Sequence, residues 1–177
     1  MFNTYRKVIS KKNIDFLLKE ITEQRLAFYL KHNKESEPTA PILYHQILKR
    51  REDRNSSEPV WNTTPEYEKL FTNIFEDFCK KASINSTEIY RACLNLTFYV
   101  GIKKCAPHSD HTYPYRQLLI YLNDADPKSK TVILDKKNKI IKKITPQKNK
   151  GIMFDSSPHY HFFPTFGCRM VLIYTFK

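Results

Sequence analysis

Residues of the types that bind metal ions stand at two places in the last third of the sequence. His108 and Asp110 form an H-x-D pair, and His159 follows 49 residues after the aspartate (159 − 110 = 49). His161 offers the same imidazole two residues further on, so either histidine can be the third ligand. Two imidazoles and one carboxylate leave coordination positions open, and this ligand set suits non-haem Fe(II).

A basic residue follows the second part of this pattern. Arg169 lies ten residues after His159 (169 − 159 = 10) and two after Gly167, at the start of an apolar run. A planar guanidinium can bind a carboxylate through two parallel hydrogen bonds. The segment therefore predicts a metal ion with an anionic group beside it. Zinc is the weaker alternative, because the arginine has no role in zinc hydrolysis.

The order and spacing of these residues resemble the Fe(II)/2-oxoglutarate-dependent dioxygenases, closest to their prolyl-4-hydroxylase-like branch. The resemblance covers residues 91–177, close to half of the chain. It implies that Fe(II) is bound by His108, Asp110 and His159, with His161 as the alternative third ligand. His159 is preferred because it places Arg169 at the interval that is usual in the family.

The same resemblance implies which residues bind the co-substrate. Arg169 is expected to hold the C5 carboxylate of 2-oxoglutarate, and Thr175 with Tyr99 or Tyr121 can add a hydrogen bond. Tyr99 resembles the tyrosine that precedes H-x-D in prolyl hydroxylases; the alternative is a boundary residue with its hydroxyl group in water. The implied cofactors are Fe(II) and 2-oxoglutarate, and the family also allows ascorbate.

The implied reaction is hydroxylation of a C–H bond with release of succinate and CO2. A peptidyl, prolyl-like substrate follows from the resemblance alone, and a small molecule stays open. The chain departs from the family because residues 130–135 lack a Gly-Gly-Glu-Thr-like segment. Nucleic-acid demethylases carry a second arginine where this chain has Thr175, so base demethylation is less expected.

A different class of function follows from the charge. The chain carries a net charge of +12, and residues 128–150 hold nine lysines against one acid, Asp135. A basic jelly-roll module that binds nucleic acid or an acidic protein without turnover is therefore the alternative. Nucleic acid is not favoured as a partner, because nucleic-acid grooves combine charge with aromatic stacking, and this segment has no aromatic residue. A solvated hairpin is the preferred interpretation.

Two helices are predicted in the first half of the chain. Ser10 can cap the first, whose apolar residues recur at helical spacing: Ile14, Leu17, Leu18 and Ile21. Thr64-Pro65 starts the second, which runs to about Lys81, because a cap residue precedes proline at the first helical position. Both helices are expected to brace a sheet.

The second half of the chain predicts strands. From Tyr90 to Val100 apolar and other residues alternate, as in a half-buried strand. Further strand-like runs are 116–122, 131–134, 139–144, 151–154 and 169–176. The expected fold class is α+β, a double-stranded β-helix (jelly roll) with N-terminal bracing helices.

One domain, 1–177, is expected from the length. Residues 1–88 would provide helical support and a loop, and 89–177 the jelly-roll catalytic core. Within the first part, 31–60 is polar and reads as a long loop with one structured piece around 42–48. A lid and a solvated connection are both open for this loop.

An intracellular, cytoplasmic location without a membrane partner is expected. The N-terminus lacks an apolar signal segment, and no apolar run approaches the length of a membrane span. The four cysteines form no C-x-x-C motif, so free thiols in a reducing compartment are the default. Nothing in the sequence specifies the oligomeric state.

Overall fold

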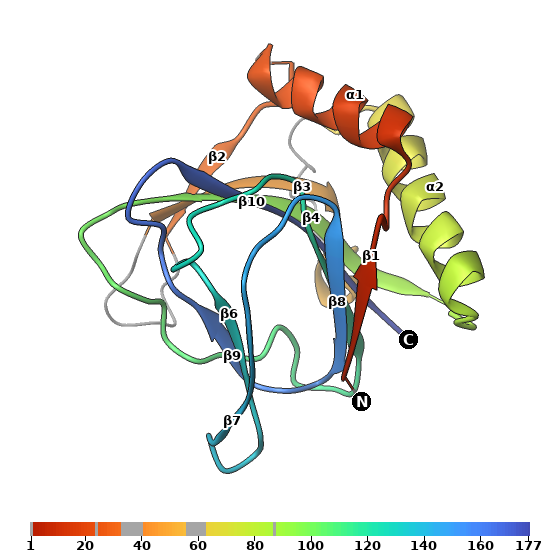
Figure 1. The fold of residues 1–177 in the computed structure, drawn as a ribbon. Coiled ribbons are helices and arrows are strands. Elements are labelled where there is room, and N and C mark those ends of the chain that lie inside the picture. Colours follow the sequence, from red (N-terminus) through yellow and green to blue (C-terminus); the bar gives the residue numbers. More distant parts are fainter. Residues whose placement is uncertain (1, 24, 33–40, 56–62, 87) are drawn as a thin grey trace.

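The computed structural model describes residues 2–23, 25–32, 41–55, 63–86 and 88–177. In these residues seven strands form an antiparallel sheet in the order β1 (Phe2–Arg6), β8 (Lys150–Asp155), β5 (Arg116–Tyr121), β10 (Cys168–Phe176), β4 (Ile89–Phe98), β3 (Pro41–Leu48) and β2 (Tyr29–His32). Three further strands of the same described part form a second sheet in the order β7 (Ile140–Ile144), β6 (Thr131–Leu134) and β9 (His159–His161). The two sheets face each other, as expected for a jelly roll (Figure 1).

The predicted helices are confirmed. Helix α1 (Lys11–Thr22) is capped by Ser10, and α2 (Pro65–Ala82) by Thr64, each of whose side chains accepts a hydrogen bond from a backbone N–H three residues on. Both helices lie on the outer side of the seven-stranded sheet (Figure 1). No helix among the described residues is both long and apolar enough to cross a membrane.

The central strands of the seven-stranded sheet are buried on both faces, because each face packs against another layer. Side chains on a strand alternate between the two faces. Even-numbered residues of its central strands pack with the helices: Leu118, Ile120, Leu172 and Tyr174. Odd-numbered residues pack toward the second sheet: Leu119, Tyr121, Val171 and Ile173. The odd-numbered face therefore borders the space between the two sheets, where a site can form.

The N-terminal part is not only helical, so the expected division of roles at residue 88 needs correction. Strands β1, β2 and β3 belong to the same sheet as β4, β5, β8 and β10. Phe2 of β1 lies opposite Phe154 of β8, and Leu43 of β3 lies opposite Leu96 of β4. These partners are remote along the chain, so short runs in residues 1–88 gave no local signal of pairing.

The polar segment 31–60 also contains more structure than a loop. β3 replaces the predicted short piece, and the short 3-10 helix η1 (Arg51–Asp53) follows it. Residues 33–40 and 56–62 lie outside the described residues, so the lid hypothesis stays a prediction there.

The lysine-rich segment forms the β6–β7 hairpin. The Asp135 carboxylate accepts hydrogen bonds from the backbone N–H groups of Lys137 and Lys139, at 2.8 Å each, in its turn. Seven of its lysines are exposed: residues 128, 136, 137, 139, 142, 143 and 148. The solvated hairpin that the sequence favoured is confirmed for the turn and for most of β7, whereas all four residues of β6 are buried.

Candidate metal centre

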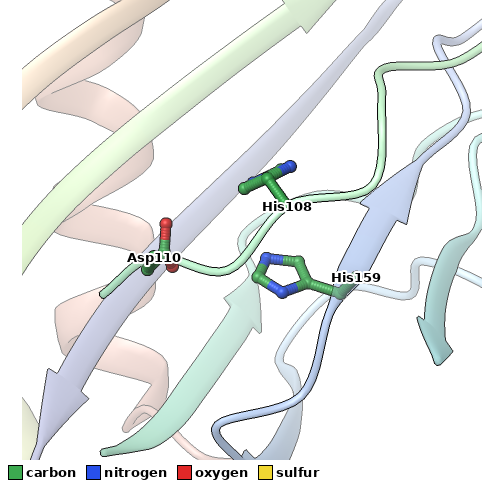
Figure 2. A group of neighbouring side chains, drawn as sticks. All are labelled: His108, Asp110 and His159. Atoms are coloured by element: carbon green, nitrogen blue, oxygen red, sulfur yellow. The ribbon is translucent and has the colours of Figure 1, made fainter. Parts of the chain in front are cut away.

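Three potential metal ligands meet in the space between the sheets (Figure 2). The nitrogen and oxygen ligand atoms of His108, Asp110 and His159 all lie within 4.8 Å of one another. His159 lies on β9, and its backbone exchanges two hydrogen bonds with that of His108, at 2.9 and 3.0 Å. This pairing sets the two imidazoles side by side, with ring centroids 4.6 Å apart. The three side chains can hold one metal ion.

Backbone carbonyl groups orient both imidazoles. Nδ1 of His108 lies 3.0 Å from the carbonyl oxygen of Ala106, and Nδ1 of His159 lies 3.2 Å from that of Ser157. Because a carbonyl oxygen only accepts, each Nδ1 carries a proton and donates it. Nε2 of both histidines is thereby the nitrogen available to a metal ion, as in sites whose ligands are held by outer hydrogen bonds.

The two histidines differ in their protonation when no metal is bound. Burial, with the charge of His108 nearby, lowers the pKa of His159 to about 4, so this ring is neutral. Burial also lowers the pKa of His108, but Cys105 and Asp110 outweigh it and raise this pKa to about 9. Since a metal ligand must be deprotonated, a metal ion has to displace one proton from His108.

The Asp110 carboxylate is held on both oxygens. Oδ1 accepts a hydrogen bond of 3.1 Å from Arg91, and Oδ2 accepts one of 2.7 Å from the Gln117 amide. Arg50 donates to the Asp110 backbone carbonyl at 2.7 Å. Burial raises the pKa of Asp110, but the Arg91 charge outweighs it and holds this pKa well below the usual range. The carboxylate is therefore ionised and fixed.

Arg169 lines the same cavity as the three ligands. Its side chain is buried, with one guanidinium nitrogen donating to the Thr131 hydroxyl at 2.8 Å. Its Nε has no hydrogen-bond partner, and among the described residues no carboxylate forms an ion pair with it. A buried cation is costly unless an anion neutralises it. The donor group therefore fits the carboxylate of a ligand in the cavity.

Only one of the tyrosines considered for the co-substrate lies near Arg169. The Tyr121 hydroxyl donates to Thr131 at 2.7 Å, and the Arg169 guanidinium lies 5.4 Å from the centroid of the Tyr121 ring. Tyr99 is 63% exposed and lines a separate hollow with Lys103 and Phe162. The structure thus does not bring Tyr99 to the cavity, and its hydroxyl group is at the surface.

Thr175 is also not brought to Arg169. Both residues project from β10, but six positions apart (175 − 169 = 6), which corresponds to ~20 Å of strand. The Thr175 side chain is fully buried, and its hydroxyl lies 2.8 Å from Nε2 of His111. Its observed contact is with the residue that follows Asp110, and the predicted contact with 2-oxoglutarate is not supported.

The two candidates for the third ligand have different surroundings. His161 lines the cavity, but its Nδ1 lies 3.2 Å from the Cys105 sulfur, and it is not in the three-residue group. Burial raises the pKa of Cys105, but His161 and His108 outweigh it and lower this pKa to about 5. His159 therefore has the better placement for a metal, and His161 forms a pair with a thiol.

Sequence reasoning missed the residues that hold Asp110. The alternation from Tyr90 to Val100 predicts a half-buried strand with Arg91 among its less apolar positions, and Gln117 belongs to no motif. β4 is in fact buried on both faces, with Arg91 only 4% exposed. A charged residue within a long, otherwise uncharged strand was the one available signal, because such a residue needs a partner when buried.

Two comparisons of the sequence found no match. No protein-family model matches it, and no curated protein matches it. Similarity is found at the level of structure. A protein of the 2OG-Fe(II) oxygenase family from Burkholderia pseudomallei superposes with a TM-score of 0.75 at 13% identity, over 99% of this chain and 84% of that one.

Two other solved structures are also similar to this chain. A prolyl hydroxylase from Trichoplax adhaerens, in complex with a peptide fragment of hypoxia inducible factor, has a TM-score of 0.67 at 13% identity, over 99% of this chain and 82% of that one. HygX from Streptomyces hygroscopicus, with nickel and 2-oxoglutarate bound, has a TM-score of 0.61 at 10% identity, over 99% and 82%.

These similarities establish the fold. The chain has the fold of the 2-oxoglutarate- and Fe(II)-dependent oxygenases, as the resemblance of its motif implied. Prolyl hydroxylases are among the structures that share it.

Proposed function

We propose that this protein is an Fe(II)- and 2-oxoglutarate-dependent dioxygenase that hydroxylates a C–H bond with release of succinate and CO2. One observation carries the proposal: His108, Asp110 and His159 line one cavity with Arg169, whose Nε has no hydrogen-bond partner among the described residues. Two imidazoles and one carboxylate suit Fe(II), and a buried guanidinium suits a carboxylate. When bound, the iron and the co-substrate supply the oxygen chemistry.

The residues of the chain have separate roles in this proposal. His108, Asp110 and His159 hold the metal, and Arg169 holds the C5 carboxylate of 2-oxoglutarate. Thr131 accepts a hydrogen bond from the guanidinium and so fixes its direction. Apolar side chains complete the wall of the cavity and exclude water from it: Leu119, Val171 and Ile173.

For the prime substrate we propose a peptidyl, prolyl-like group. Support comes from the fold shared with the Trichoplax adhaerens enzyme in complex with a peptide and with a prolyl-4-hydroxylase from Pseudomonas putida. A small-molecule substrate is the alternative, because the same fold occurs in a carbocyclase of nogalamycin biosynthesis.

A basic binding module without turnover ranks second as a function, because it gives no role to the buried Arg169.

The proposal predicts metal-dependent consumption of 2-oxoglutarate. Purified protein in air with Fe(II) should form succinate slowly even without a prime substrate, and chelation of the metal should stop it. His159→Ala should reduce the rate to background, since it removes a ligand. Lys142→Ala, on the exposed hairpin, is the matched control and should keep the wild-type rate. Iron-loaded wild-type protein that forms no succinate, with or without candidate peptides, would contradict the proposal.

A further inference from the structure

Three buried polar side chains form a row across the seven-stranded sheet. Thr175 of β10 lies opposite Arg91 of β4 on one side and opposite Gln117 of β5 on the other. Residues directly opposite one another on neighbouring strands project from the same face. Arg91 is 4% exposed, and Thr175 and Gln117 are fully buried. We call these three residues the polar row.

Each member of the polar row contacts one of two consecutive loop residues, Asp110 or His111. Arg91 and Gln117 donate to the two carboxylate oxygens of Asp110, as described above. Nδ1 of His111 lies 3.3 Å from a Glu52 carboxylate oxygen, so this nitrogen carries the proton. Nε2 of His111 therefore accepts the hydrogen bond that the Thr175 hydroxyl donates at 2.8 Å.

The loop needs such support because Asp110 belongs to neither sheet. His108 is tied to β9 by backbone hydrogen bonds, whereas Asp110 lies in a bend without ladder pairing. Within the described part of the chain, its backbone N–H and carbonyl groups bond only to side chains, those of Tyr115 and Arg50. Side chains of the rigid sheet are thus what fixes the position of this carboxylate.

The polar row carries a cost that sheet packing alone does not require. Gln117 Oε1 and Arg91 Nε are buried, and no described residue provides either atom with a hydrogen-bond partner. A buried polar atom without a partner is destabilising, and leucine would fill the place of Gln117 without that penalty. The Gln117 amide group makes a hydrogen bond to Asp110 Oδ2 alone among the described residues. Its contact with Asp110 is therefore the feature that explains its presence.

We propose that the polar row presents the Asp110 carboxylate to the metal, with Gln117 as a positioning residue. This inference rests on the proposed function, because it takes Asp110 as a metal ligand. Each carboxylate oxygen accepts one hydrogen bond from the row and keeps a further lone pair for a metal ion. Holding the carboxylate before metal arrives strengthens binding, because the ligand needs no ordering when the ion enters.

Gln117→Leu tests this directly, because it removes the donor while leaving volume and charge nearly unchanged. Co(II) is titrated into the metal-free protein without 2-oxoglutarate and followed by its visible ligand-field absorption. We expect binding to weaken by about 10–100-fold, the range typical of outer partners of metal ligands, with a changed absorption spectrum. A purely structural role would lower thermal stability and leave the spectrum and affinity of the folded protein unchanged.

A second pair of variants keeps the test open if Gln117→Leu does not fold. Thr175→Val removes the hydroxyl that holds His111, and Thr175→Ser retains it, so only the valine variant should weaken Co(II) binding. Thr97→Val is the matched control, because Thr97 is an equally buried threonine of the same sheet whose hydroxyl bonds to the Arg169 carbonyl group. It should bind Co(II) as the wild type does.

The outcomes separate this inference from the proposed function. If wild-type protein binds no Co(II), the metal site and with it the proposed function are contradicted. If wild-type protein binds Co(II) and folded Gln117→Leu and Thr175→Val bind it equally well, the metal site stands and the positioning role of the row is overturned.

Discussion

Asp110→Ala should lower the free energy of unfolding of the metal-free protein by about 3–5 kcal/mol, because it leaves the Arg91 charge buried and unpaired. Asp110 and Arg91 side chains are 9% and 5% exposed, and Arg91 Nη1 lies 3.1 Å from Asp110 Oδ1. Equilibrium unfolding in urea, followed by circular dichroism, measures the loss. The consequence for experiments is that an inactive Asp110→Ala variant does not by itself identify a metal ligand.

The double variant Arg91→Met/Asp110→Ala is the control for this prediction. It removes both charges, so it should recover the stability that the single variant loses to the unpaired Arg91 charge, while the Gln117 amide still lacks its partner. It should still bind no metal, since the carboxylate is gone. Equal stability of Asp110→Ala and the wild type would show that the ion pair does not form as the structure has it.

Acid should have a related effect on the wild-type protein. The pKa of Asp110 is lowered in the folded state from an ordinary value of 3.8, so its ionised form contributes stability above that pH. This contribution should be lost progressively as the pH falls below about 4. The double variant lacks the ion pair, so its stability should fall less over the same pH range in parallel urea titrations.

The second large effect is expected at the two candidate histidines of β9. His159→Ala should weaken Co(II) binding by more than about 100-fold, beyond the range typical of outer partners of a metal site. His161→Ala should stay within that range, because His161 contacts Cys105 and lies outside the three-residue group. Calorimetric titration of both variants measures the difference. The reverse order of the two affinities would assign the third ligand to His161.

Local patterns in the sequence predicted much of this fold. The caps Ser10 and Thr64 marked the starts of both helices, and regular alternation marked β4. Strands β1 (FNTYR) and β9 (HYH) were missed because they are short and, unlike β6 (TVIL), contain no continuous apolar run. Their existence depends on pairing with partners elsewhere in the chain, which local propensity does not encode.

The site was predictable only in part for a similar reason. The resemblance of the motif to the dioxygenases pointed to His108, Asp110 and His159 with Arg169, and the structure places these side chains around one cavity. The support around them depends on strand register, which no motif reveals. Register places Thr175 between Arg91 and Gln117, the two residues that hold Asp110.

The most direct test of the proposed function is the spectrum of the protein with both cofactors in the absence of oxygen. Fe(II) and 2-oxoglutarate added to the wild-type protein should give a weak visible charge-transfer band, because the co-substrate chelates the iron. In Arg169→Ala the band should need much more 2-oxoglutarate. Among the described residues no carboxylate forms an ion pair with Arg169, so the variant leaves no buried carboxylate without its partner. Wild-type protein that binds Fe(II) yet gives no band at saturating 2-oxoglutarate would contradict the account.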